Sequence, residues 1–321
     1  MTNNLPCGHV SLQDKNPPCF PFLPDSTRSD TSSDDPGAQK IDSKTQVPWL
    51  TILLPAYNEE LRIEPTLIDY QSYLETSELW QDRTSILVVD DGSRDGTIRV
   101  LKRYMASSKS TITVECVSLS SNEGKGSAIS FGIQHILRKH PVSLILTADA
   151  DGSADINGLP TAYTALVELL QKDKSGTVLN WDQAAVVSGY RTHESASASR
   201  LIFRWGFRTV VKIIVGDLRV KDSQCGFKLM TSSAASVLYR DLNVNGWSHD
   251  VEVLYRAREL QIPIAERNIQ WEDKDGSKLV ASPGGIPAVV VRMFWEVLLV
   301  RWGYKIEGWE VPSNDSGSSI P

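Results

Sequence analysis

Cysteine is scarce in this chain, with four among 321 residues. Neither Cys7, Cys19, Cys116 nor Cys225 has another cysteine at the spacing of a metal site, and a chain of this length with so few is not a disulfide scaffold. We therefore predict reduced thiols in a reducing compartment. Cys116 lies in an apolar run and is predicted to be a small buried hydrophobic residue.

Long apolar runs and an excess of basic residues are also missing. No stretch of 18 or more uncharged apolar residues occurs, so the sequence predicts no transmembrane helix, and its polar, proline-rich start is unlike a secretory signal. The net charge of −6 argues against a nucleic-acid-binding protein. No GxGxxG motif follows the first predicted strand, which argues against a dinucleotide-binding oxidoreductase.

The composition divides the chain into three parts. Residues 1–46 are rich in Ser, Thr, Asp, Asn and Pro and cannot bury enough apolar surface to offset chain entropy, so we predict a disordered polar leader. The remainder has the composition of an ordinary globular protein, with 41% hydrophobic and 22% charged residues in the chain as a whole. We predict one domain over residues 47–310 and a disordered tail over 311–321.

Short apolar runs alternate with helical stretches in the first half of this domain. Such an alternation predicts βαβ units, and hence an α/β fold with a mostly parallel sheet and helices on both faces. The predicted strands are 50–55, 85–90, 111–117 and 143–147, and the predicted helices are 60–75, 96–105 and 124–138. Ligands of such sheets bind at the carboxyl ends of the strands.

A polar motif follows each of the four predicted strands. The pair Asp149 and Asp151 is the sharpest, because two carboxylates just past a strand can face one divalent cation. Mg²⁺ or Mn²⁺ commonly takes one or two carboxylates together with substrate phosphates. A solvated turn is the ordinary alternative for such a pair. Four polar loops at one sheet edge favour the metal site.

The loops after the second and third predicted strands supply further candidates. Asp90 and Asp91 can accept hydrogen bonds from a base or a ribose, although a helix cap and a turn explain the same residues. Lys125 lies between two glycines at the start of a predicted helix, where an anion is favoured. An ordinary helix start is the alternative, since the P-loop pattern is incomplete.

The second half of the chain is less regular. Arg191 follows another apolar run, Asp222 and Lys228 place an acid and a base around a turn, and Asp250 precedes a predicted helix. We interpret the neighbouring His249 as a structural or capping residue.

Two amphipathic helices are predicted at about 197–215 and 285–303. In the first, four basic residues recur every four positions beside aromatic ones, which fits a helix lying on a membrane surface as well as an ordinary solvated face. They are Arg200, Arg204, Arg208 and Lys212. The second is apolar but interrupted by charges, so core packing is the alternative to membrane attachment.

Taken together, the motifs resemble those of the dolichyl-phosphate β-glucosyltransferase family. This family belongs to the inverting glycosyltransferases with the GT-A fold, a Rossmann-like nucleotide-sugar-binding fold. The resemblance covers about residues 49–304 and rests on LPAYNEE, VVDDGSRDGT, NEGKGSA, TADADGS, SGYR, DSQCGFKL, HDVEVLY and WEDKDGSK.

The resemblance implies a site and a reaction. Asp149 and Asp151 would hold Mg²⁺ or Mn²⁺, and Arg191 and Lys228 would meet phosphates of donor or acceptor. Asp222 and Asp250 would position the acceptor or serve as a base. The nucleotide pocket would be lined by Pro55, Tyr57 and Glu59, with Asp90 or Asp91 reaching the uracil.

The implied substrates are UDP-glucose and dolichyl phosphate, and the implied location is the cytosolic face of the endoplasmic reticulum membrane. Members of the family usually carry an N-terminal hydrophobic anchor, whereas this sequence starts with a polar stretch, so peripheral attachment to the membrane surface is expected. The alternatives are a dolichyl-phosphate mannosyltransferase, another polyprenyl-phosphate sugar transferase, or an inactive nucleotide-sugar-binding protein. The intact D-x-D pair argues against the last.

Overall fold

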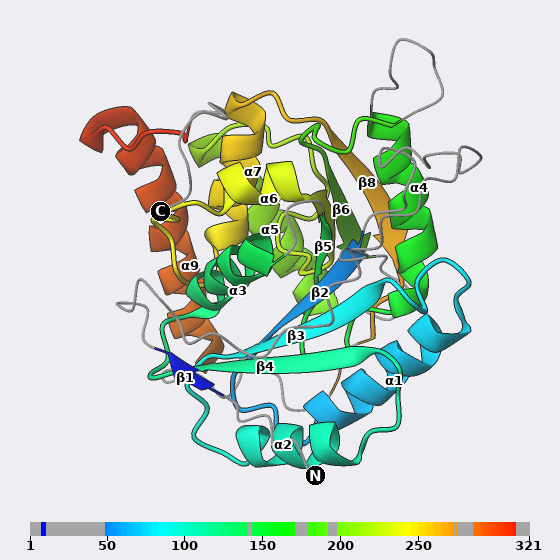
Figure 1. Cartoon of the computed structure of the whole chain (residues 1–321). Helices are drawn as coiled ribbons and strands as arrows, with labels where there is room; N and C mark the ends of the chain where they lie inside the picture. The colour runs from blue at the N-terminus through cyan, green and yellow to red at the C-terminus, as the bar shows by residue number, and fades with distance from the viewer. Residues whose placement is uncertain are drawn as a thin grey trace, which may run out of the picture.

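A computed structural model gives the arrangement of most of the chain (Figure 1). The residues that it describes are 8–10, 49–139, 143–170, 179–191, 198–272, 274 and 285–312.

The described strands form one mixed, mostly parallel sheet of eight strands in the order β1-β4-β3-β2-β5-β7-β6-β8. Strand β7 runs antiparallel to both of its neighbours, and every other adjacent pair is parallel. The strands are β1 (Gly8–Val10), β2 (Trp49–Ala56), β3 (Thr84–Asp90), β4 (Thr113–Leu119), β5 (Ser143–Thr147), β6 (Val186–Arg191), β7 (Lys228–Thr231) and β8 (Ile264–Ile269).

Helices cover both faces of this sheet (Figure 1). On one face lie α1 (Ile63–Thr76), α2 (Thr97–Ser107) and α4 (Leu159–Leu169), and on the other lie α3 (Lys125–Lys139), α6 (Ser232–Leu238) and α7 (His249–Glu259). The remaining helices are α5 (Ala198–Ile214), α9 (Gly285–Trp302), a short 3₁₀ turn η2 (Ile156–Gly158) and a π-helical turn η3 (Gly303–Glu307). The predicted GT-A-type α/β architecture is confirmed.

Strand β2 shows why the apolar runs were recognisable. Its side chains alternate between two cores: Ile52 and Leu54 pack with α1, α2 and α4, whereas Leu53 packs with α3, α6 and α7. A parallel strand that is covered on both faces reads as a continuous apolar run. All four predicted strands and all three predicted helices are present, with ends shifted by a few residues.

The start of α1 is the largest of these shifts, at Ile63 rather than residue 60. The preceding backbone is held by the neighbouring loop instead. The amide of Glu59 donates to Thr97 Oγ1 at 2.7 Å, and that of Glu60 donates to Asp95 Oδ2 at 3.2 Å. These contacts tie the loop after β2 to the loop after β3.

The N-terminal segment departs from its prediction in one place. Strand β1 lies inside the predicted disordered leader and pairs with β4, Gly8 opposite Val117. Backbone pairing at a sheet edge does not require an apolar segment, so composition gave no sign of it. The rest of residues 1–46 and most of the predicted tail fall outside the described residues.

The two predicted amphipathic helices are α5 and α9. Their inner faces join α7 in a third apolar cluster that includes Val211, Val251, Val297 and Val300. Core packing therefore accounts for part of both helices. No helix among the described residues is long and apolar enough to cross a membrane.

Candidate active site

The loop that follows β5 carries the D-x-D pair. Lys125, at the start of α3, places its Nζ 2.5 Å from Asp149 Oδ1. The same carboxylate lies beside Gly226, where an added Cβ atom would come 2.7–2.8 Å from Oδ1, Cγ and Oδ2 of Asp149. The carboxylate of Asp149 therefore pairs with Lys125 in a space that a side chain at position 226 would fill.

Asp151 has a different environment. Its Oδ1 accepts hydrogen bonds from the Ser153 amide at 3.0 Å and the Ser153 hydroxyl at 2.7 Å. Its Oδ2 faces Arg62 Nη1 at 3.7 Å, and Arg62 also pairs with Glu59 at 2.6 Å. The sequence analysis did not single out Arg62. Its position three residues after Glu59 could have suggested an ion pair between the two.

These residues fit a divalent metal that is completed by a ligand. Among the described residues no cluster of three or more His, Cys, Asp and Glu side chains could hold a metal ion by itself. Mg²⁺ and Mn²⁺ accept a site with one or two carboxylates when phosphate oxygens supply other positions. Asp149 and Asp151 together match that donor set.

Lys125 is a charged residue in a partly enclosed position. Burial lowers its pKa, but the carboxylates of Asp149 and Asp250 outweigh burial and raise the pKa overall. Its Nζ also lies 5.8 Å from the centre of the Trp247 ring. The ammonium group thus stands between an acid and an aromatic face.

Glycines make this position of Lys125 possible. Gly124 has a φ of +102°, and a Cβ there would come 2.4 Å from the carbonyl oxygen of Asn245. The amide of Gly126 donates to the same oxygen at 2.9 Å. The first turn of α3 can therefore lie directly on the segment that precedes α7.

Asp90 and Asp91 were both candidates for ligand binding or for a turn, and the structure gives them different environments. Asp91 accepts hydrogen bonds from the amides of Glu123 at 2.7 Å and Gly124 at 3.0 Å, and from Asn122 Nδ2 at 3.0 Å. Burial raises the pKa of Asp91 to about 6, against the lowering effect of those amides. Asp91 thus holds the loop that leads to Lys125.

Asp90 has one carboxylate oxygen that is available to accept a hydrogen bond. Its Oδ2 accepts from Ser118 Oγ at 2.8 Å and the Ser93 amide at 3.2 Å, whereas its buried Oδ1 has no hydrogen-bond partner in the structure. A buried carboxylate oxygen without a donor is unusual and suits a residue that receives one from a ligand.

The other predicted lining residues lie close by. Pro55 is the penultimate residue of β2, Tyr57 follows that strand, and Glu59 is buried beside Arg62. Asn58 fixes this loop, with a φ of +55°, because its amide donates to Ser93 Oγ at 2.8 Å.

Arg191 and Asp222 form a closed pair. The guanidinium donates from Nε at 2.6 Å and from Nη2 at 2.9 Å to the two carboxylate oxygens, and it stacks on Trp271 at 4.9 Å. The pKa of Arg191 is raised, because Asp222 outweighs the effect of burial. A carboxylate held in this way is a poor base, which disfavours the predicted base role of Asp222.

Lys228 and Asp250 form a second pair, which is buried. Lys228 is fully buried and donates to Asp250 Oδ1 at 2.7 Å and to the Cys225 carbonyl. The prediction that Lys228 meets a phosphate does not match this environment, because its ammonium group is enclosed by protein acceptors. The lysine is the first residue of β7, a strand in the interior of the sheet, whereas the sequence predicted only a turn there.

His249 is enclosed by the same cluster. Its Nδ1 lies 2.9 Å from the Gly246 carbonyl, which can only accept, so Nδ1 carries the proton. Burial lowers the pKa of His249. This environment agrees with the structural role expected for His249.

Comparison with known proteins places this chain in a family. The model of the family described as glycosyl transferase family 2 matches residues 51–236. Dolichyl-phosphate beta-glucosyltransferase from Mus musculus is 32% identical over 314 residues, which cover 95% of this chain and 90% of that protein. The Homo sapiens protein of the same name is 34% identical over 270 residues, which cover 82% and 78%.

Solved structures support the fold. Glucosyl-3-phosphoglycerate synthase from Mycobacterium tuberculosis, in complex with Mn²⁺, UDP and glucosyl-3-phosphoglycerate, superposes with a TM-score of 0.52 at 18% identity. The match covers 85% of this chain and 87% of that one. The same enzyme in complex with Mn²⁺, UDP-glucose and glycerol 3-phosphate gives a TM-score of 0.51, also at 18% identity.

Proposed function

This chain belongs to glycosyl transferase family 2 and, within it, to the dolichyl-phosphate β-glucosyltransferases, and we propose that it transfers glucose from UDP-glucose to dolichyl phosphate. The product, dolichyl β-D-glucosyl phosphate, would serve lipid-linked oligosaccharide assembly for protein N-glycosylation. The observation that carries the proposal is the position of Asp149 and Asp151 at the carboxyl end of β5, beside Lys125, in a chain of this family.

The donor would lie across the carboxyl ends of β2, β3 and β5. Pro55, Tyr57 and Glu59 would line the nucleotide pocket, and the unpartnered Oδ1 of Asp90 would accept an N–H of the uracil. Asp91 would act indirectly, by holding the loop that carries Lys125.

The departure of UDP is the demanding step, since negative charge builds on its diphosphate. Mg²⁺ or Mn²⁺ held by Asp149 and Asp151 would neutralise that charge. Lys125 Nζ, beside Asp149, would supply a fixed cation where the charge develops.

The acceptor requires little acid–base assistance. A phosphate monoester is already anionic at neutral pH, so its oxygen can form the bond to the anomeric carbon while the bond to the UDP oxygen breaks. One such in-line displacement inverts the anomeric centre. No free base is needed, which is compatible with the pairing of Asp222 with Arg191 and of Asp250 with Lys228.

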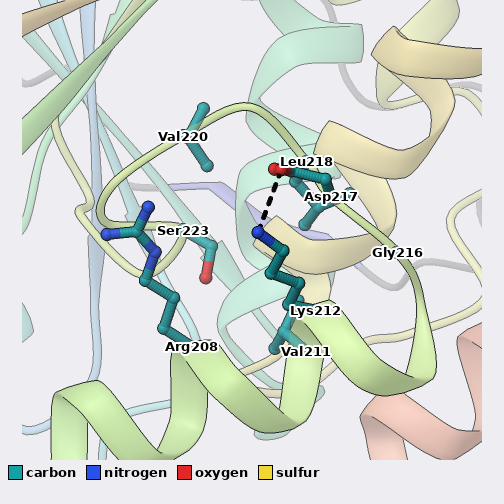
Figure 2. Close-up of a pocket in the computed structure, with 8 residues that line it drawn as sticks. All are labelled: Arg208, Val211, Lys212, Gly216, Asp217, Leu218, Val220 and Ser223. Carbon is teal, nitrogen blue, oxygen red and sulfur yellow. Dashed lines mark ion pairs between the residues drawn. The ribbon is translucent and has the colours of Figure 1, made fainter.

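The acceptor phosphate would approach past the end of α5. Figure 2 shows a pocket between this helix and the loop that leads to Asp222, with Arg208 and Lys212 reaching toward the loop. Lys212 pairs there with Asp217 at 3.3 Å, and both side chains are exposed. Arg200 and Arg204 lie in the same helix, but their side chains fall outside the described ones.

Helix α9 supplies an apolar surface for peripheral attachment to the cytosolic face of the endoplasmic reticulum membrane. One side of the helix packs on the core, whereas the other side exposes large apolar side chains. These are Val291, Phe294, Trp295, Leu299 and Trp302. Exposed aromatic residues next to Arg292 and Arg301 are typical of a helix at a lipid surface.

Removal of the metal tests the proposal. We expect Asp149→Asn and Asp151→Asn to abolish transfer of glucose to dolichyl phosphate and leave the melting temperature close to that of the unchanged protein. Asp69→Asn, at an exposed site on α1, is the matched control and should retain full activity. Undiminished transfer in excess EDTA would refute the proposed metal site.

A further inference from the structure

Helix α9 is joined to the start of α7 by one buried carboxylate. The two helices pack together (Figure 1), and on the packed side of α9 the side chain of Glu296 is only 10% exposed. Its Oε2 accepts a hydrogen bond from the amide of Ser248 at 2.8 Å. The hydroxyl of Ser248 donates in turn to the carbonyl of Met293 at 3.2 Å. Since Ser248 is the residue that precedes α7, helix α9 fixes the point where α7 begins.

The surroundings of Glu296 explain why a carboxylate stands there. An amide at the start of a helix finds no acceptor within that helix, so a buried one needs an acceptor from elsewhere. Glu296 supplies it for Ser248. Gly246 leaves the room that the carboxylate occupies, because a Cβ atom at that position would meet its oxygen atoms. The second oxygen, Oε1, accepts from Arg292 Nε at 3.2 Å, on the same helix.

A second carboxylate holds the other end of the same segment. Glu252, which is fully buried in α7, accepts hydrogen bonds from the amides of Asn243 at 3.1 Å and Val244 at 2.7 Å. The segment 243–248 is therefore fixed at both ends. Its first end is fixed by α7 itself, and its last end is fixed by α9.

This segment lies on the first turn of α3, which carries Lys125. The amide of Gly126 donates to the carbonyl of Asn245 at 2.9 Å. The centre of the Trp247 ring lies 5.8 Å from Lys125 Nζ, and Asp149 Oδ1 lies 2.5 Å from the same nitrogen. A cation over an aromatic face at this distance is attracted to it. The position of the ammonium group thus depends on the segment that Glu296 holds.

We propose that Glu296 is a positioning residue for the transfer reaction. By fixing the end of the segment 243–248, it keeps the Trp247 ring beside Lys125 and so orients the cation that faces the departing diphosphate. Glu296 acts through Lys125 and not on a substrate. The inference rests on the proposed function, and it gives α9 a role in supporting the reaction centre in addition to its proposed role at the membrane surface.

Two substitutions of nearly equal size isolate the hydrogen bond to Ser248. Glu296→Met removes the acceptor and keeps much of the side-chain volume, whereas Glu296→Gln keeps an oxygen that can accept from the amide. We expect Glu296→Met to lower kcat for glucose transfer about tenfold, because a displaced cation stabilises the developing charge less well. The KM for dolichyl phosphate should change by less than about twofold. Glu296→Gln should restore kcat to within about twofold of the unchanged protein.

The same substitution in a Lys125→Met chain separates positioning from general support of the fold. If Glu296 acts through Lys125, Glu296→Met should cause less than about a twofold further loss of kcat in that background. An equal fold-loss in both backgrounds, or full activity of Lys125→Met alone, would overturn the inference. All rates would be measured well below the lowest melting temperature of the set.

Gly246→Ala disturbs the same contact from the opposite side, and it should repeat the pattern in both backgrounds even if Glu296→Met does not fold. Full activity of Gly246→Ala would likewise count against the inference. Glu307→Ala is the matched control, because it removes an exposed carboxylate from η3, directly after α9, and should retain full kcat. Absence of glucose transfer by the unchanged protein would contradict the proposed function instead, so the two failures are distinguishable.

Discussion

The ion pair between Lys228 and Asp250 provides a sharp test of how the site is supported. The lysine side chain is 0% exposed and the aspartate side chain 5%, with Nζ and Oδ1 2.7 Å apart. Lys228→Met keeps much of the apolar volume and leaves the carboxylate of Asp250 buried without its cation. The sequence motif alone would assign this lysine to phosphate binding, whereas its burial against Asp250 favours a positioning role.

The expected loss is large because an unpaired charge stays in the interior. Removing one partner of a buried pair costs about 3–5 kcal/mol in the free energy of unfolding. For a domain of this size about 2–4 °C is lost per kcal/mol, so the melting temperature should fall by roughly 6–20 °C. Replacing both partners, Lys228→Met with Asp250→Asn, removes the stranded charge and should recover part of the loss.

Scanning calorimetry of Lys228→Met, Asp250→Asn, the double variant and Lys102→Met, which replaces an exposed lysine of α2, completes the cycle. The exposed control should stay within about 0.5 kcal/mol of the unchanged protein. Retained activity in Lys228→Met, together with an unchanged melting temperature, would refute the buried pair. A normal melting temperature with a raised KM for dolichyl phosphate would instead restore the phosphate-binding role.

Asp90, Asp91 and the exposed tryptophans of α9 can each be tested separately. Asp90→Ala should weaken UDP binding in calorimetry about tenfold, since one ligand hydrogen bond to a buried carboxylate is lost; unchanged affinity would exclude Asp90 from the pocket. Burial raises the pKa of Asp91 from 3.8 to about 6, so its contribution to stability is present below about pH 4 and declines as the pH rises through 6. Asp91→Asn should remove this part of the pH dependence of the melting temperature, and an unaltered pH profile would contradict it. Replacing Trp295 and Trp302 by Ser should reduce sedimentation with anionic liposomes and leave UDP binding intact; unchanged sedimentation would exclude α9 from the membrane surface.

The strands and helices of the first half of the domain could be predicted from the sequence because the strands are covered on both faces. Ile52, Leu53 and Leu54 all lie in a core, so a continuous apolar run marks the strand without ambiguity. The polar motifs then follow at strand ends, and Asp149 and Lys125 meet there as the motifs suggest.

The sequence does not reveal which polar residues hold one another. Asp90 and Asp91 are neighbours in the same motif, yet one anchors a loop and the other keeps a free acceptor. The difference arises from residues about thirty positions away, Ser118 and Glu123, which only the sheet brings close. The burial of Lys228 could not be predicted for a related reason. Strand β7 lies antiparallel between β5 and β6, and the order of strands in the sheet cannot be read from the local sequence.

The transfer reaction itself shows which sugar the chain moves and whether the D-x-D pair is needed for it. The purified chain would be incubated with dolichyl phosphate, Mn²⁺ and either labelled UDP-glucose or labelled GDP-mannose, and the labelled lipid would be extracted and counted. We predict a glucolipid from UDP-glucose, no mannolipid above background, and no product from Asp149→Asn. Transfer from GDP-mannose with an equal or higher kcat/KM, or no transfer from UDP-glucose, would show that the chain is not a dolichyl-phosphate β-glucosyltransferase.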